Sequence, residues 1–152
     1  MNSAMAPRPI NVLLVEDNIG DVRLTQEALK EGKLKVNLTV AKDGMEAMEI
    51  LQHQNGQSDT PRPDLILLDL NLPRKDGREV LKEIKDDKNL MRIPVVVLTT
   101  SEADSDILTT YGLHANCYIT KPVDMDRFVE IVKMLEEFWF TIVRLPSHDN
   151  EL

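Results

Sequence analysis

The sequence predicts an α/β protein built on a doubly wound, five-stranded parallel sheet. Three apolar runs, at 10–15, 65–68 and 95–98, lack the polar alternation of a half-exposed strand and suit strands buried on both faces of a sheet. Segments with helical periodicity lie between them, which favours helical crossovers between parallel strands. The purest apolar strands belong at the centre, so we expect the strand order 2-1-3-4-5.

The first third of the chain predicts two strand–helix units. The strand Ile10–Val15 ends in Glu16 and Asp17, and Asp17 or Asn18 can cap the helix that follows. A glycine ends that helix, a weakly alternating outer strand follows at 34–40, and a second helix opens after it. The expected inward-facing residues are Val22, Leu24, Ala28 and Leu29 in the first helix and Met45, Met48 and Leu51 in the second.

The central strand, 65–68, ends abruptly in a carboxylate, Asp69. A polar loop precedes this strand, and Pro73 and Gly77 form a second loop after it. The helix at 78–87 then directs Val80, Leu81 and Ile84 to one face. A carboxylate at a strand end can be a nucleophile, a metal ligand or a helix cap.

The second half of the chain predicts two further strands. The run 95–98 ends in Thr99, a polar helix follows at 102–111, and the last strand, 116–119, precedes Lys121. The extended final helix runs from 124 to 144 and stops before a proline. Its apolar sector is too wide to dock on one sheet, and we expect a homodimer interface there. The expected interface residues are Phe128, Phe138, Trp139 and Ile142.

Composition bounds the domain organisation and the class of partner. The 152 residues suit a single domain at 10–146, with a flexible arm at 1–9 and a flexible tail at 147–152. The net charge of −8 disfavours nucleic-acid phosphates. The single cysteine excludes an internal disulfide, and neither a signal peptide nor a membrane-spanning run is visible. We therefore expect a cytoplasmic protein without a membrane or nucleic-acid partner.

Polar residues at the strand ends predict a shared site, because parallel strands end at one edge of the sheet. Glu16 and Asp17 follow the first strand and Asp69 ends the third, its expected neighbour. Carboxylates so close repel one another unless a cation joins them. Carboxylate oxygens, with the backbone carbonyl of Asn71 beside them, favour Mg²⁺.

The strand-end residues resemble those of response regulator receiver domains, which have a flavodoxin-like (βα)5 fold. The matching features are the acidic pair Glu16-Asp17, the spacing of Asp69, Pro73 and Gly77, and the later Thr99 and Lys121-Pro122. In this family an aspartate accepts a phosphoryl group from a sensor histidine kinase, and the domain signals by protein–protein contact. We expect no second domain after residue 152, and therefore a stand-alone receiver without a separate enzyme activity.

The resemblance implies a role for each site residue. Asp69 would be the phosphoryl acceptor, Asp17 the main Mg²⁺ ligand and Glu16 an indirect ligand through water. Thr99 and Lys121 would contact the phosphoryl oxygens. Tyr118 would be the aromatic switch that remodels the face formed by the fourth helix, the fifth strand and the fifth helix. Slow self-dephosphorylation is also implied. Glu16 replaces the aspartate more usual in the family, which gives a longer reach.

Two positions keep alternatives at this stage. Thr100 lies beside Thr99, and a one-residue shift of register would exchange their places. Tyr118 can be a packing residue, as tyrosines at strand ends often are. Several segments, among them the one around Phe138 and Trp139, also resemble the small regulators paired with cyanobacterial phytochromes. A phytochrome or bacteriophytochrome is therefore one candidate kinase.

Two other function classes compete with a receiver. A haloacid-dehalogenase-type phosphatase also uses a strand-end aspartate with Mg²⁺, but it needs a second aspartate two residues later, where this chain has Asn71. A phosphorylation-independent binding module of the same fold would lack one of the acceptor-site residues. Asp17, Asp69, Thr99 and Lys121 are all present, which favours the receiver.

Overall fold

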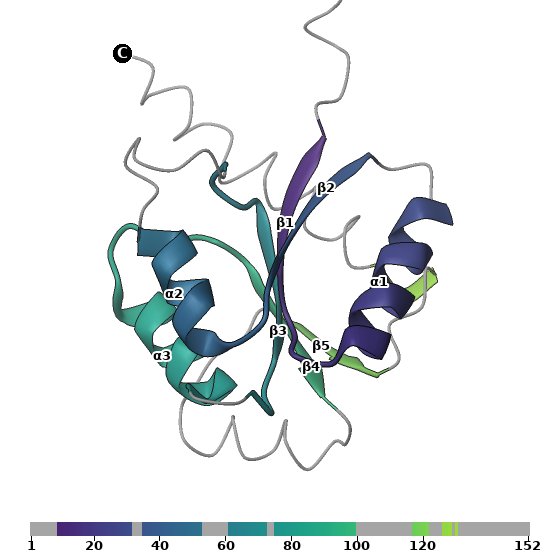
Figure 1. Cartoon of the computed structure of the whole chain (residues 1–152). Coiled ribbons are helices and arrows are strands. Elements are labelled where there is room, and N and C mark those ends of the chain that lie inside the picture. Colours follow the sequence, from purple (N-terminus) through teal and green to yellow (C-terminus); the bar gives the residue numbers. More distant parts are fainter. Residues whose placement is uncertain are drawn as a thin grey trace, which may run out of the picture.

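The computed structural model describes residues 9–31, 35–52, 61–72, 75–99, 117–121, 126–128 and 130. Its sheet has five parallel strands in the order β2-β1-β3-β4-β5, with α1 on one face and α2 and α3 on the other (Figure 1). The predicted fold class and strand order are therefore confirmed. The strands are β1 (Ile10–Val15), β2 (Val36–Ala41), β3 (Leu65–Asp69), β4 (Val95–Thr99) and β5 (Cys117–Thr120), and the helices are α1 (Ile19–Glu31), α2 (Gly44–Gln52) and α3 (Gly77–Asp86).

The three apolar strands form the centre of the sheet because they can be buried on both sides. All five residues of β3 are buried, and β3 lies between β1 and β4. Alternate residues of each strand enter two separate cores. Ile66 and Leu68 pack with α2 and α3, whereas Leu65 and Leu67 pack with α1 residues and Phe128. Each buried leucine stabilises the fold by roughly 1.5–3 kcal/mol.

Side-chain caps start the three helices just after the carboxyl edge of the sheet. Oδ1 of Asn18 accepts a hydrogen bond from the Asp21 backbone N–H at 2.9 Å, so Asn18 rather than Asp17 caps α1. Oδ1 of Asp43 accepts one from Glu46 at 2.8 Å. Asp76 likewise caps α3 and accepts a hydrogen bond at 2.7 Å. Such caps contribute about 1 kcal/mol each, and that of α1 leaves Asp17 available to the site.

The predicted inner faces of α1 and α2 are wrong at two positions. Leu24 is 55% exposed and Met45 is 47% exposed. In α1, Val22 and Leu29 do face the second core, and the buried position between them belongs to Thr25. Steps of three and four residues place Val22, Thr25 and Leu29 on one helix face, and Leu24 points away from it. The predicted face of α3 is confirmed, because Val80, Leu81 and Ile84 are all buried.

Phe128, which we expected at a dimer interface, is 1% exposed and packs in the core beside Leu65 and Ile119. The expectation that it offers an exposed aromatic ring to a partner is corrected, since its ring is already buried in the core on the α1 face of the sheet. Residues 126–128 and 130 are helical, as predicted for the final helix. The predicted helix at 102–111, the remainder of the final helix, most of the arm and the tail lie outside the described residues.

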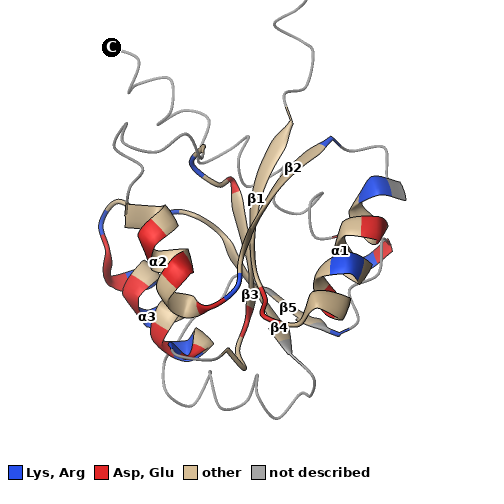
Figure 2. Cartoon of the chain, viewed as in Figure 1, with Lys and Arg blue, Asp and Glu red and all other residues tan. Residues whose placement is uncertain are grey.

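Charged residues recur along all three helices (Figure 2). On α2 and α3 acidic residues lie among a smaller number of lysines and arginines, in keeping with the net charge of −8. None of the helices in the described part of the chain is both long and apolar enough to span a bilayer.

Candidate functional site: an acidic cluster with a lysine at the carboxyl edge

The strand register brings the predicted site residues to one edge of the sheet. Val15 of β1 pairs with Leu68 of β3. Glu16 and Asp69 each follow the paired residue in the sequence, so they are neighbours. Asp69 in turn pairs with Leu98 of β4, and Lys121 follows the last residue of β5. Three strands that are distant in sequence therefore deliver their terminal polar residues to a single place.

Three carboxylates form the centre of this site. Glu16, Asp17 and Asp69 each offer an oxygen that lies within 4.8 Å of the others. Glu16 and Asp69 are buried, whereas Asp17 is exposed. The site is therefore open toward Asp17, and a small cation could be bound there by oxygen atoms from all three residues.

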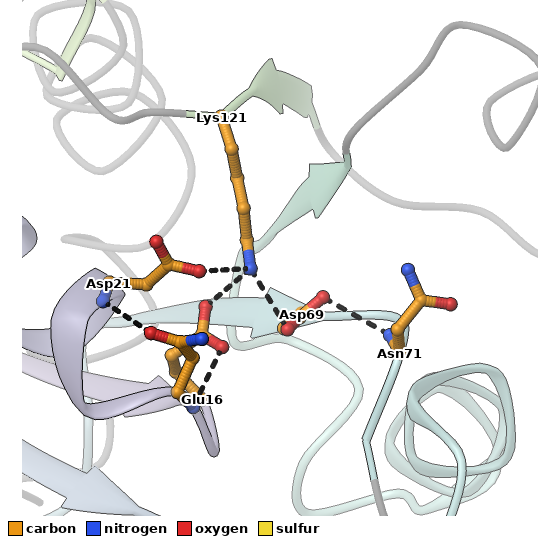
Figure 3. Close-up of polar contacts among 6 residues, drawn as sticks. Glu16, Asp21, Asp69, Asn71 and Lys121 are labelled. Carbon is orange, nitrogen blue, oxygen red and sulfur yellow. Dashed lines mark hydrogen bonds and ion pairs between the residues drawn. The ribbon is translucent and has the colours of Figure 1, made fainter.

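The ammonium of Lys121 lies among these carboxylates, as Figure 3 shows. Its Nζ is 2.7 Å from Oε1 of Glu16, 3.0 Å from Oδ2 of Asp69 and 3.1 Å from Oδ2 of Asp21. The side chain of Lys121 is only 14% exposed. A buried ammonium needs such partners, and Lys121 here supplies positive charge to a strongly acidic site.

Asp21 is the one residue of this group that sequence reasoning missed. It lies in the first turn of α1, and its ion pair with Lys121 joins residues 100 positions apart. An acidic residue in a first helical turn normally interacts with the helix dipole, so Asp21 has an adequate local explanation without a role in the site. The signal that could have found it is its distance of one helical turn from the acidic pair Glu16-Asp17.

Burial and charge set the protonation of the two buried ionisable partners. Burial raises the pKa of Glu16 from 4.5 to about 7, although the Lys121 ammonium lowers it and Asp69 raises it further. For Lys121, burial by itself lowers the pKa, but Glu16, Asp69 and Asp21 together outweigh burial and raise it above the usual lysine range. Lys121 therefore carries its charge at every physiological pH.

One backbone and one side-chain hydrogen bond fix the orientation of the Asp69 carboxylate. Its Oδ1 accepts a hydrogen bond from the Asn71 N–H at 3.1 Å, while Oδ2 accepts one from Lys121. The Gly77 N–H donates to the Leu70 carbonyl at 3.1 Å. A Cβ atom on Gly77 would lie 2.6 Å from the Leu70 Cα, so only glycine allows α3 to start so close to Asp69.

The remaining predicted residues lie around this centre. Asn71 is exposed beside Asp69, and coordination by its backbone carbonyl stays a prediction. Thr99 is the last residue of β4, and Thr100 lies outside the described residues. Tyr118 is half-buried and packs against the core on the side of α2 and α3.

The cation predicted from the sequence fits an observation at Glu16. Oε1 of Glu16 is buried and accepts no hydrogen bond of good geometry from the described residues, although the ammonium of Lys121 is an ion-pair partner. A buried acceptor of this kind is costly unless a further group satisfies it. Together with the neighbouring oxygens of Asp17 and Asp69, it makes a donor set suited to a divalent cation.

A parallel sheet in this order, with an acidic cluster and a lysine at its carboxyl edge, defines the class of the protein. Residues 12–133 match the family of response regulator receiver domains, and the chain belongs to that family. It is thus a receiver of two-component signalling, as the sequence motifs indicate.

Among receiver domains, the chain is similar to several cyanobacterial response regulators. The response regulator Rcp1 of Synechocystis sp. is 50% identical over 139 residues, which cover 91% of this chain and 95% of Rcp1. The crystal structure of the phosphorylated cyanobacterial phytochrome response regulator RcpA is 52% identical, with a TM-score of 0.69 over 88% of this chain and 96% of that one. The Mn²⁺-bound form of Rcp1 is 50% identical, with a TM-score of 0.67 over the same shares.

Proposed function

We propose that this receiver accepts a phosphoryl group on Asp69 from a sensor histidine kinase. The observation that carries the proposal is the Lys121 ammonium, 3.0 Å from the Asp69 carboxylate and beside an acidic cluster. A carboxylate that is hydrogen-bonded through both oxygens is held in one orientation, which favours attack on a phosphorus atom.

The proposed reaction is a phosphoryl transfer between two side chains. An oxygen of Asp69 forms a bond to phosphorus while the phosphorus–nitrogen bond of a kinase phosphohistidine breaks, and the imidazole nitrogen keeps the electron pair. Lys121 then faces the transferred group and stabilises the negative charge on its oxygens. Hydrolysis of the resulting acyl phosphate returns Asp69 slowly to the carboxylate. The receiver is thus an acceptor and not an enzyme with a separate substrate.

The proposed cofactor is Mg²⁺. Asp17, Asp69 and the backbone carbonyl of Asn71 would hold it directly, and Glu16 would hold it through water. When bound, Mg²⁺ supplies charge neutralisation between the carboxylates and the incoming phosphoryl oxygens. The support is the all-oxygen donor set and the buried Glu16 Oε1, whose partner among the described residues is the ammonium of Lys121. The Mn²⁺-bound form of the relative Rcp1 supports a divalent ion of this type.

The proposed output is a rearrangement that starts at Thr99 and Tyr118. Thr99 would donate a hydrogen bond to the phosphoryl group, and Tyr118 would turn into the space it leaves. The half-buried position of Tyr118 at the fifth strand supports this role. The remodelled face would then contact another protein.

The partners are proposed on the same basis. The phytochrome regulator RcpA among the relatives supports a phytochrome-type histidine kinase as the phosphodonor. We retain the homodimer proposal through Phe138, Trp139 and Ile142, without Phe128, and we place the protein in the cytoplasm. The domain is proposed to span 10–146, between the arm and the tail.

Acetyl phosphate with Mg²⁺ tests the acceptor directly, because this small donor needs no kinase. Intact mass should show one labile phosphoryl adduct in the wild-type chain and none in Asp69→Asn. The matched control is Asp64→Asn, which changes an aspartate next to the same strand but outside the cluster. No adduct in the wild type, or an equal adduct in Asp69→Asn, would refute the proposal.

Sedimentation velocity tests the dimer separately. Wild-type chain should sediment as a dimer, and Trp139→Ala should shift it toward monomer. A wild-type monomer at all concentrations, with and without beryllofluoride as a phosphoryl mimic, would remove the dimer proposal.

A further inference from the structure

Asp21 contacts the acceptor site without belonging to its acidic cluster. Its Oδ2 lies 3.1 Å from the ammonium of Lys121, and it comes from the opposite side to Asp69, from the start of α1 (Figure 3). The group of oxygens that can share a cation comprises Glu16, Asp17 and Asp69 and leaves Asp21 out. Asp21 therefore interacts with the site through Lys121.

The ammonium of Lys121 has three N–H donors and three carboxylate partners, Glu16, Asp69 and Asp21. A divalent cation in the proposed site would also engage two of these partners, Asp69 directly and Glu16 through water. A cation beside them would compete for these oxygens and repel the ammonium. Asp21 is then the partner that Lys121 keeps, because its carboxylate takes no part in the cation site.

We propose that Asp21 is a positioning residue, whose carboxylate holds the ammonium of Lys121 at the acceptor site when cation and phosphoryl group occupy the oxygens of Glu16 and Asp69. This inference rests on the proposed function and adds a residue to it. Asp21 is anchored for this role by α1, because its backbone N–H is bound by the cap residue Asn18 at 2.9 Å. Its side chain is 35% exposed, so its effect is moderate and does not decide whether transfer occurs.

The test compares rates of phosphorylation by acetyl phosphate over a range of Mg²⁺ concentrations. Asp21→Asn should lower the maximal rate about threefold to tenfold, the effect of one partly exposed charged hydrogen bond. The Mg²⁺ concentration for half-maximal rate should change less than about threefold, because Asp21 is no ligand. Loss of a residue that merely keeps the site folded would lower the maximal rate and raise the required Mg²⁺ concentration together.

Three further variants make the result specific. Asp21→Glu keeps the carboxylate and should recover part of the rate, while Asp21→Ser should repeat the loss and replaces Asp21→Asn if that variant does not fold. Glu27→Gln is the matched control, since it removes one negative charge from an exposed position of the same helix. It should keep the wild-type rate.

Each outcome decides between the proposals. If the wild-type chain takes up no phosphoryl group, the proposed function is wrong, and the role of Asp21 falls with it. If the wild type is phosphorylated and Asp21→Asn reacts at the same rate, only the positioning role is wrong. A more than tenfold rise in the Mg²⁺ requirement, or an Asp21→Glu rate as low as that of Asp21→Asn, also overturns that role.

Discussion

Gly77, the first residue of α3, lies directly against the backbone carbonyl of Asp69. A Cβ atom added to Gly77 would be 2.3 Å from that carbonyl oxygen, a distance that no side chain can occupy. The Asp69 carbonyl is a backbone group and a Cβ is attached directly to the backbone, so rotating a side chain could not relieve the clash. The start of α3 and the proposed phosphoryl acceptor are therefore coupled in position.

Gly77→Ala should lower the free energy of unfolding by about 2–4 kcal/mol, because β3 or α3 must move to accept the methyl group. Urea denaturation measures the loss. Gly20→Ala is the control, since its nearest neighbour is the Asn18 Oδ1 at 3.1 Å, which needs to shift by only a small fraction of an ångström, and we expect a change within about 1 kcal/mol. Equal effects of the two substitutions would contradict the close packing at Asp69.

The raised pKa of Glu16 predicts a pH dependence of stability when divalent ions are removed by a chelator. The pKa is about 7 in the folded chain against 4.5 for the free side chain, so between these values the folded state binds more protons than the unfolded state. The stability contribution of Glu16 is therefore fully present below pH 4.5 and is lost as pH rises to about 7. The loss amounts to about 3 kcal/mol.

Glu16→Gln isolates this contribution, because it removes the titration and keeps the shape of the side chain. The unfolding free energy of the wild type minus that of the variant should fall from pH 5 to pH 8, because only the wild type loses the Glu16 contribution. Lys121 does not contribute to the slope, since its raised pKa keeps it protonated throughout. A constant difference across this range would show that the Glu16 carboxyl is not shifted.

Replacement of Lys121 by methionine should destabilise the chain in the absence of divalent ions by about 2 kcal/mol, since Glu16 and Asp69 lose a shared counter-charge. Mg²⁺ should then raise the melting temperature of Lys121→Met more than that of wild type, because the ammonium no longer competes for the same oxygens. Thermal unfolding with and without Mg²⁺ measures both effects. Lys82→Met, which breaks an exposed pair with Asp86, should cost less than about 1 kcal/mol.

Phe128→Ala should lower the unfolding free energy by about 3–5 kcal/mol, the cost of removing a fully buried aromatic ring. Leu24→Ala removes a large apolar side chain that is 55% exposed, and it should cost less than about 1 kcal/mol. Chemical denaturation of the two variants compares a core position with a surface position. A small loss for Phe128→Ala would favour the interface role that the structure argues against.

The strands and their order could be predicted from the sequence because a strand buried on both faces is recognisable as a nearly continuous apolar run. The runs ending at Leu68 and Leu98 contain no polar residue, and the run ending at Val15 contains only Asn11. Such runs suit the central strands of a parallel sheet, which are buried on both faces. The ends of these runs then located Glu16, Asp17 and Asp69. This part of the site followed from strand direction alone.

Helix faces and cross-chain contacts were harder to predict, for physical reasons. Leu24 and Met45 are apolar residues on the exposed side of α1 and α2, and a helix tolerates such residues at little cost. Thr25 is polar but buried, because its position on α1 faces the sheet. Asp21 meets Lys121 across 100 positions of the sequence, and its closeness to Glu16-Asp17 is the only hint of this contact that the sequence contains.

The charges at the acceptor site come from opposite ends of the chain, Glu16 just after β1 and Lys121 just after β5. During translation, a growing chain that has not yet released Lys121 from the ribosome lacks the counter-charge for Asp69. Such an unfinished molecule has the carboxylates of this edge without the ammonium that pairs with them. The complete charge arrangement can therefore form only after β5 has been synthesised and has joined the sheet.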